Sequence, residues 1–386
     1  MASKTGFKKE SVRAIYDYVR ESGPATKNGI AAALNMSLPT VNKYITHFMD
    51  EDLMTLGEKM PAGSQGGRSP NSYACIADGR LAVGVDITRE SIQCLVVNLE
   101  REVIHRRTVR HTFARSDDYF TAVAQTVVDT VKESGIDEQK VLGVGVAVPG
   151  LISETSESVT YGQVLQNEGV SVTDFGRHLP YRARLVHDSD AAGLAEFWSG
   201  HTGGNAFYIS LSRSVGGSIL INGEIFRGDG EFAGEIGHVR IHTDGELCYC
   251  GQRGCMDAYC NARVLADAAD GTLAGFFQRL ADDDDHLSDV WDVYTSNLAR
   301  AVHNVRVLFG CPVILGGDVG AHIRPHMPAI HSKVDRLSFL ASNSTSFLHP
   351  CNYQDSPVAT GAALYLIDEF HQELGPPQPR PLYQGA

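Results

Sequence analysis

Residues Gly234–Asp257 read GEIGHVRIHTDGELCYCGQRGCMD, and this stretch decides what kind of molecule the chain forms. It holds one imidazole, His238, and three thiols in C-x-C-x4-C spacing, Cys248, Cys250 and Cys255. Three thiolates and one imidazole complete a tetrahedral zinc site and leave no position for a bound water. A closed site of this kind shapes the protein rather than performing catalysis. The pattern therefore predicts one structural zinc ion held by these four side chains.

Two carboxylates flank the predicted metal ligands. Glu235 lies three residues before His238, and Asp257 lies two residues after Cys255. Carboxylates at the edge of a closed metal site suggest that the metal shapes a ligand pocket. The alternative is that the thiols are reduced core cysteines that happen to lie near one another. Four ligand groups in one short loop favour zinc over that alternative.

The composition indicates a cytoplasmic protein of two or three domains. The chain has 386 residues, more than an ordinary single domain, with 43% hydrophobic and 20% charged residues. Its first residues, MASKTGFKKE, contain no apolar run of a secretory signal, and no stretch approaches membrane-spanning length. The remaining cysteines are therefore expected to be reduced core thiols: Cys75, Cys94, Cys260, Cys311 and Cys351.

The net charge of −13 is unevenly distributed along the chain. Residues 1–70 carry about +2, whereas the remainder carries about −15. An acidic body argues against a protein that coats nucleic acid nonspecifically. The mildly basic beginning permits DNA binding that is confined to the first domain.

The beginning of the chain predicts three short helices, over about 8–20, 27–34 and 38–50. The third follows a turn in which Ser37 is a suitable N-cap and Pro39 lies in the first helical turn. After Leu53 the sequence predicts a two-stranded wing with a Gly-rich tip. The residues expected to contact DNA are Ser37, Pro39, Thr40, Asn42, Lys43 and, on the wing tip, Arg68.

Two short helices joined by a tight turn, the second exposing small polar groups and a lysine, are typical of a helix-turn-helix that enters a major groove. Small helical triplets also serve as protein-docking modules. The local charge and the wing favour DNA as the partner.

The rest of the chain alternates buried strands with helices. Apolar strands are expected over 80–97 around Asp86, as a further strand pair over 99–110, and over 141–150. Another strand ends at Val186, where Asp188 begins a helix, and acidic groups at the ends of buried strands often mark a ligand site. A β-hairpin is expected over 207–226 with Gly216-Gly217 between its strands. Helices over 262–308, a strand over 311–317 and a last helix capped by Ser356 complete the prediction.

These residues resemble the ROK family, which is named for repressors, unknown reading frames and sugar kinases. The motifs that carry the resemblance are HDSDAAGLAE, GDGEFAGEIGH and CYCGQRGCMDAY, and the similarity extends over nearly the whole chain. It implies an α/β protein: a winged helix-turn-helix followed by a two-lobed, actin-like (ribonuclease-H-type) domain with a sugar cleft and a zinc loop. The implied divisions are 1–76 for the head, 77–195 with the C-terminal helix 356–376 for the first lobe, and 196–355 for the second lobe.

The resemblance also assigns residues to the two sites. The zinc ligands of the family fall on His238, Cys248, Cys250 and Cys255. Its sugar-contacting residues fall on Asp188, Glu235, His238 and, with a shorter side chain, Asp257, while His187 replaces an Asn that usually precedes the Asp. Carboxylates suit this role because each accepts hydrogen bonds from two adjacent sugar hydroxyls.

Kinases of the family use the counterpart of Asp188 as the base and need glycine-rich loops around the ATP phosphates. The first of these loops usually reads D-x-G-x-T, and this chain has Asp86-Ile87-Thr88-Arg89-Glu90 at that place. The second usually reads G-T-G, and this chain has Ser212-Arg213-Ser214. The added side chains crowd the phosphate position, and Glu90 repels an anion, although Arg213 would attract one. We therefore expect no ATP and no catalytic residue, with Asp188 as a vestigial base position.

The predicted function is a transcriptional repressor that binds operator DNA as a homodimer or homotetramer, has no membrane partner, and is released by a sugar or sugar phosphate. The first alternative is an active ATP-dependent sugar kinase that carries a regulatory DNA-binding head. The second is a regulator whose small helices dock on a protein.

Overall fold

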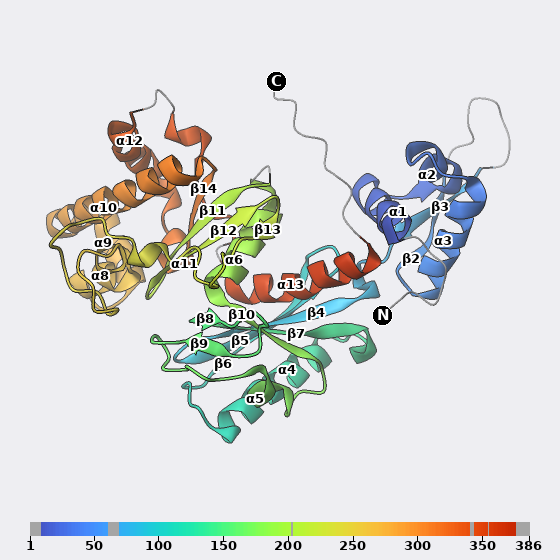
Figure 1. Cartoon of the computed structure of the whole chain (residues 1–386), viewed down its shortest axis with the longest axis horizontal. Coiled ribbons are helices and arrows are strands. Elements are labelled where there is room, and N and C mark those ends of the chain that lie inside the picture. The colour runs from blue at the N-terminus through green and yellow to red at the C-terminus, as the bar shows by residue number, and fades with distance from the viewer. Residues whose placement is uncertain (1–8, 61–68, 202–203, 340–342, 354, 376–386) are drawn as a thin grey trace.

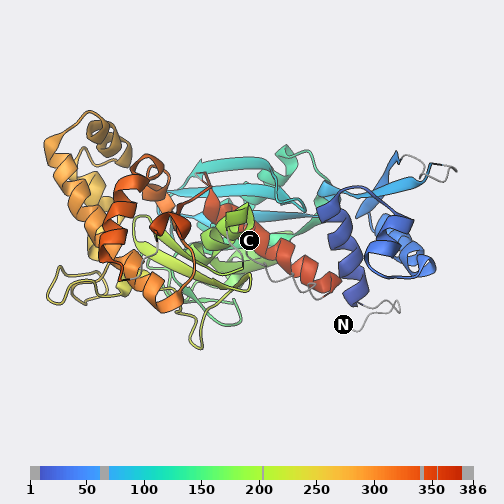
Figure 2. The same ribbon diagram turned by 90° about the horizontal axis from the view of Figure 1, so that it is seen from above.

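The computed structural model contains a small N-terminal head and two α/β lobes (Figure 1). It describes residues 9–60, 69–201, 204–339, 343–353 and 355–375. The head and the helical end of the second lobe lie at opposite ends of the long axis (Figure 2). Among the described residues, no helix has the length and apolarity needed to cross a membrane.

The head combines three helices with a three-stranded antiparallel sheet of order β1-β3-β2. Its elements are α1 (Lys9–Ser22), β1 (Ala25–Thr26), α2 (Lys27–Ala33), α3 (Leu38–Asp50), β2 (Met54–Lys59) and β3 (Asn71–Cys75). The Ser37 hydroxyl accepts a hydrogen bond from the Thr40 N–H at 3.3 Å, so the predicted N-cap of α3 is confirmed. The predicted wing-tip residue Arg68 lies outside the described residues.

The first lobe is built on a five-stranded sheet of order β10-β7-β4-β5-β6. Its strands are β4 (Leu81–Ile87), β5 (Ser91–Asn98), β6 (Val103–Arg110), β7 (Val141–Val148) and β10 (Ala183–His187). The antiparallel β4-β5-β6 meander is joined by β7 and β10, which run parallel to β4. Helices α4 (Asp117–Glu133) and α5 (Val172–Gly176) lie on one face of this sheet, and α13 (Pro357–Leu374) lies on the other (Figure 1). A short hairpin of β8 (Leu151–Ile152) and β9 (Val159–Tyr161) lies beside it.

Glycines bring α13 into backbone contact with the sheet. A Cβ atom at Gly84 would lie 1.8 Å from the Ala359 carbonyl oxygen, and one at Gly145 would lie 2.1 Å from that of Ala362. No side chain fits in such a space. At its far end α13 packs against α1 of the head, where the rings of Tyr16 and His371 have centroids 5.6 Å apart. One helix therefore contacts both the first lobe and the head.

The second lobe is built on a mixed sheet of order β13-β12-β11-β14-β15. Its strands are β11 (Ala206–Leu211), β12 (Val215–Ile221), β13 (Glu224–Ile225), β14 (Val313–Gly316) and β15 (Leu348–Pro350). Its helices are α7 (Asp257–Cys260), α8 (Ala262–Ala268), α9 (Leu273–Ala281), α10 (Asp285–Phe309), α11 (Gly317–Gly320) and α12 (Met327–Leu337). Helix α6 (Asp188–Glu196) lies between the sheets and packs against α13, β11 and β12.

Three local predictions are wrong. Residues 99–110 contain one strand, β6, rather than two. The Asn98 side chain accepts hydrogen bonds from the Glu100 and Glu102 amides, so the chain turns there and the strand begins only at Val103. Ser356 occupies the N-cap position of α13 and Pro357 follows it, as predicted, but the Ser356 side chain does not cap the helix: the residue has a left-handed φ of 52°, and its hydroxyl donates to Gln93 Oε1 at 3.1 Å.

The third error concerns Gly216-Gly217, which lie inside β12 opposite Ser210 and Ile209, whereas the turn of the hairpin is Ser212–Ser214. A Cβ at Gly216 would lie 2.1 Å from Ser189 Oγ, and one at Gly217 would lie 2.6 Å from the Gly234 carbonyl oxygen. These glycines therefore allow α6 and the loop before His238 to approach the strand.

Candidate functional site

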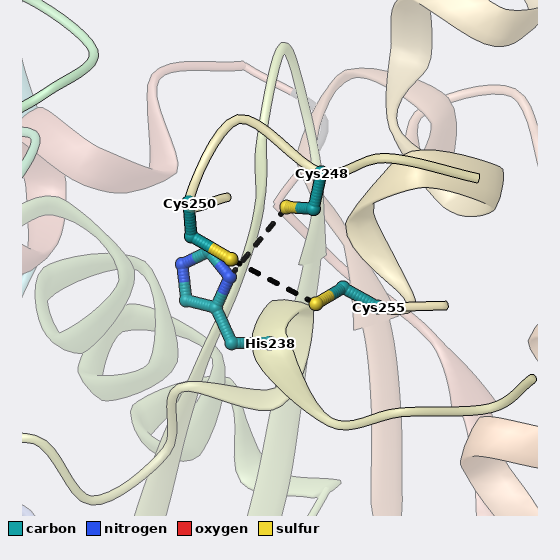
Figure 3. Close-up of side chains that lie close together, drawn as sticks. All are labelled: His238, Cys248, Cys250 and Cys255. Carbon is teal, nitrogen blue, oxygen red and sulfur yellow. Dashed lines mark hydrogen bonds between the residues drawn. The ribbon is translucent and has the colours of Figure 1, made fainter. Parts of the chain in front are cut away.

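His238, Cys248, Cys250 and Cys255 converge on one point, with all four candidate ligand atoms within 4.8 Å of one another (Figure 3). The Cys250 and Cys255 sulfurs are 3.8 Å apart, and Cys248 Sγ lies 3.8 Å from His238 Nδ1. Sulfurs bound to zinc at about 2.3 Å at tetrahedral corners are separated by about 3.8 Å, whereas a disulfide would bring them to about 2.05 Å. The spacing of the donor atoms and their chemistry therefore fit a tetrahedral metal ion.

The backbone of the loop holds this arrangement. The Cys248 amide donates to the Gln252 carbonyl at 2.8 Å, and Gly251 N donates to the Cys248 carbonyl at 2.9 Å. Gly254 has a φ of +80°, and a Cβ there would lie 1.8 Å from the His242 carbonyl oxygen. Burial raises the pKa of the Cys248 thiol, and a bound cation would oppose this shift by stabilising the thiolate.

A cavity of about 360 Å³ lies between the two lobes, beside the metal-ligand cluster. The first lobe contributes Asp86, Thr88, Arg89, Glu90, Pro149, Tyr161 and His187 to its walls. The α6 helix contributes Asp188 and Ser189, and the second lobe contributes Ser212, Arg213, Glu235, His238, Tyr249 and Asp318. This volume is in the range of about 300–1,000 Å³ that is usual for small-molecule sites.

Four of the five residues predicted for the sugar site line this cavity: His187, Asp188, Glu235 and His238. His187 Nε2 lies 3.3 Å from Asp188 Oδ1, at the beginning of α6. Asp257 is not among the described residues that line the cavity, and only 2% of its surface is exposed. Its carboxylate instead accepts a hydrogen bond from the Val215 amide at 2.6 Å. Asp257 therefore braces the hairpin turn from behind the cavity wall.

Acidic groups dominate the electrostatics of the cavity. Burial and the carboxylates of Asp188 and Asp318 raise the pKa of Asp86 to about 7. Burial alone would lower the pKa of His187, but the neighbouring Asp188, Asp190 and Glu235 outweigh it and raise that pKa. Burial also raises the pKa of Glu235. Such a cavity is rich in hydrogen-bond acceptors, which suits a ligand rich in hydroxyl groups.

His238 has a different environment at each ring nitrogen. Nδ1 faces the sulfurs, whereas Nε2 faces the cavity, 3.2 Å from the Tyr249 hydroxyl and 4.0 Å from Glu235 Oε2. Sequence reasoning missed Tyr249, which lies between Cys248 and Cys250. The one feature of the sequence that could have indicated Tyr249 is its position between Cys248 and Cys250. A side chain between two metal ligands points away from the metal-ligand cluster and can therefore face a neighbouring cavity.

The two altered loops meet across the cavity. Thr88 closes the first turn, where its hydroxyl accepts from the Ser91 amide at 3.1 Å. Arg213, from the turn between β11 and β12, places its guanidinium 3.8 Å from the Glu90 carboxylate of the first lobe. Both side chains are exposed, so the ion pair adds little stability. It nevertheless places side chains of opposite charge across the cavity between the lobes.

On the head, the described members of the predicted DNA-contacting set lie at the start of α3. Ser37, Pro39 and Lys43 are exposed, and Thr40 and Asn42 are half-buried. A shallow hollow on the same helix is lined by Asn42, Lys43, Thr46, His47 and Asp50. The helix is held from behind by Val41, Tyr44, Ile45 and Phe48, all buried.

A model of the ROK family matches residues 82–369. The chain belongs to the ROK family. Its head lies before the matched region. The matched region includes the four residues of the metal-ligand cluster.

Several ROK relatives are named as repressors. The chain is 26% identical to the xylose repressor of Caldicellulosiruptor bescii over 246 residues, covering 62% of this chain and 61% of that protein. It is 22% identical to the xylose repressor of Bacillus subtilis over 269 residues, covering 69% of each. The chain thus spans about three fifths of the length of the Caldicellulosiruptor relatives that it matches. It is also 33% identical to an N-acetylmannosamine kinase of Escherichia fergusonii, over 35% of this chain and 49% of the kinase.

Solved structures show the same fold. A ROK family transcriptional regulator, described as a homologue of the E. coli MLC protein, matches with a TM-score of 0.77 at 19% identity and covers 95% of this chain and 98% of its own. A ROK family glucokinase from Streptomyces griseus, in complex with glucose and AMPPNP, matches with a TM-score of 0.62 at 21% identity and covers 74% of this chain and 98% of its own.

Proposed function

We propose that this ROK protein is a sugar-responsive transcriptional repressor. A homodimer or homotetramer would bind operator DNA through a winged helix-turn-helix, using Ser37, Pro39, Thr40, Asn42, Lys43 and Arg68. A sugar or sugar phosphate in the cavity would release it. The observation that carries this proposal is the pair of altered loops: Glu90 and Arg213 stand opposite each other where a kinase of this family needs open glycine-rich backbone.

The sugar would bind through His187, Asp188, Glu235 and His238. The two carboxylates accept hydrogen bonds from hydroxyls, and both flank one cavity with the His238 Nε2. Asp257 would act indirectly, by bracing Val215. His238, Cys248, Cys250 and Cys255 would hold a structural zinc ion, whose contribution is to fix the loop that carries His238 and Tyr249.

Two comparisons support a DNA-binding role for the head. Relatives named as repressors of xylose share the ROK region. The regulator's fold covers 95% of this chain, whereas the glucokinase covers 74% and leaves out roughly the length of the head. The helices, the capped start of α3 and the antiparallel sheet behind them fit a winged helix-turn-helix.

The competing proposal is an active sugar kinase. It is favoured by Asp188, which lines the cavity at the beginning of α6, and by the kinase relative. A coupled assay of ADP release over D-xylose, D-glucose and N-acetyl-D-mannosamine separates the two proposals. The repressor proposal predicts no sugar-dependent turnover but a higher melting temperature with the bound sugar, since a ligand selective for the folded state stabilises it. Turnover that Asp188→Asn abolishes would establish the kinase instead.

A further inference from the structure

Tyr249 projects from the metal-binding loop into the sugar cavity, between two of the metal ligands. Its phenolic oxygen lies 3.2 Å from His238 Nε2, and the two rings are nearly perpendicular, with centroids 5.2 Å apart. The residue lines the cavity together with Glu235, and 45% of its surface is exposed. A side chain that reaches the cavity from this loop is placed to contact whatever the cavity binds.

The direction of the hydrogen bond between His238 and Tyr249 follows from the metal-ligand cluster. Nδ1 faces the cluster, 3.8 Å from Cys248 Sγ, and a nitrogen that binds a metal carries no proton. The hydrogen of the neutral ring is then on Nε2, which donates to the phenolic oxygen of Tyr249. A tyrosine phenol has an ordinary pKa of about 10 and therefore keeps its own hydrogen at neutral pH. That O–H is therefore available to donate to a ligand.

Glu235 offers the complementary group. Its Oε2 lies 4.0 Å from His238 Nε2, which is too long for a hydrogen bond. An ionised carboxylate only accepts hydrogen bonds, whereas the Tyr249 O–H is free to donate. A ligand hydroxyl placed between them would accept a hydrogen bond from Tyr249 and donate one to Glu235. Each group from His238 to Glu235 would then donate to the next one.

We propose that Tyr249 and Glu235 together recognise one hydroxyl group of the sugar, with Tyr249 as the donor. An ether or carbonyl oxygen at that point cannot donate to Glu235, and a methylene group can do neither. Tyr249 thereby supplies a cavity contact that Asp257 does not make, because Asp257 is only 2% exposed and is not among the described residues that line the cavity. This inference rests on the proposed sugar-binding function and adds a residue that determines specificity.

The test is Tyr249→Phe, which removes the hydroxyl and keeps the ring. Isothermal titration calorimetry would measure the affinity of the wild type and the variant for D-xylose, D-glucose and N-acetyl-D-mannosamine, and then for the monodeoxy analogues of the strongest binder. The variant should bind that sugar about tenfold more weakly, the usual effect of one lost hydrogen bond. One deoxy analogue, the one without the recognised hydroxyl, should bind both proteins with equal affinity.

The matched control is Tyr259→Phe, which makes the same change near the loop but away from the cavity. The Tyr259 hydroxyl accepts a hydrogen bond from the Glu246 amide at 2.6 Å. The substitution Tyr259→Phe should therefore leave the affinity for the sugar unchanged. Equal sugar affinity of wild type and Tyr249→Phe would overturn the inference, as would a tenfold loss that persists for every deoxy analogue. Loss of zinc from Tyr249→Phe would show a structural role and also overturn it. If the wild type binds none of these sugars, the proposed function itself fails.

Discussion

At the scale of single residues, the four metal ligands make the sharpest prediction. Cys255→Ala should lose bound zinc and about 3 kcal/mol or more of unfolding free energy, because metal binding to such a loop is coupled to its folding. Cys311→Ala is the matched control, since Cys311 is also buried but lies outside the cluster. It should keep one zinc per chain and lose about 1 kcal/mol. Elemental analysis and urea unfolding measure both quantities, and a full equivalent of zinc in Cys255→Ala would contradict the metal assignment.

Asp86 makes a prediction about pH. Its pKa is about 7 in the folded protein and about 3.9 in an unfolded chain. Between these values the unfolded chain releases the proton and the folded protein keeps it, so this residue lowers stability as the pH rises from about 4 to 7. Asp86→Asn should therefore stabilise the protein by about 2.6 kcal/mol more at pH 8 than at pH 5. Urea unfolding of both proteins at both pH values measures this difference, and a difference that does not depend on pH would contradict it.

The metal-ligand cluster could be predicted because its donors lie close together in the sequence and have distinctive chemistry. The placement of Asp257 could not, because it depends on the Val215 amide, which is 42 residues away in the chain. Tyr249 was missed for a related reason. Its role depends on which side of the loop faces the cleft, and the C-x-C spacing does not specify that.

At the scale of elements, helix α3 makes the prediction about DNA. Lys43→Ala should weaken binding to operator DNA and lower the slope of log affinity against log salt concentration by about one, because one phosphate contact is lost. Lys132→Ala, which alters another exposed lysine on α4 of the first lobe, should change neither quantity. Fluorescence anisotropy over a salt series measures both. Equal effects of the two substitutions would rule out a specific role for α3.

The order of helices and strands in both lobes follows the sequence pattern closely, but the position of one turn was predicted wrongly from a pair of glycines. Gly216-Gly217 resemble a turn in the sequence, yet they lie inside β12 and allow α6 and the loop before His238 to pack against it. A glycine required by a distant neighbour cannot be distinguished from a turn glycine without knowledge of that neighbour. Ser356 shows the same limit, because its hydroxyl bonds to Gln93 of a distant strand.

At the scale of the whole molecule, a continuous set of packed helices joins the cavity to the head. Asp188 begins α6, α6 packs against α13, and α13 packs against α1 of the head (Figure 2). The contact between α6 and α13 is very close, since a Cβ at Gly361 would lie 1.6 Å from the Ala191 carbonyl oxygen. A ligand that shifts α6 would therefore have to move α13 as well. Such a ligand relieves repression only if it prefers the state that cannot bind DNA.

The most direct test of this account is the affinity of the full-length protein for the DNA upstream of its own gene, measured by fluorescence anisotropy with and without the sugar that binds it. We predict specific binding without the sugar and an affinity at least about tenfold lower at saturating sugar, within the usual range of coupling between two sites. Failure to bind that DNA, or an affinity that is the same with and without the sugar, would contradict the account.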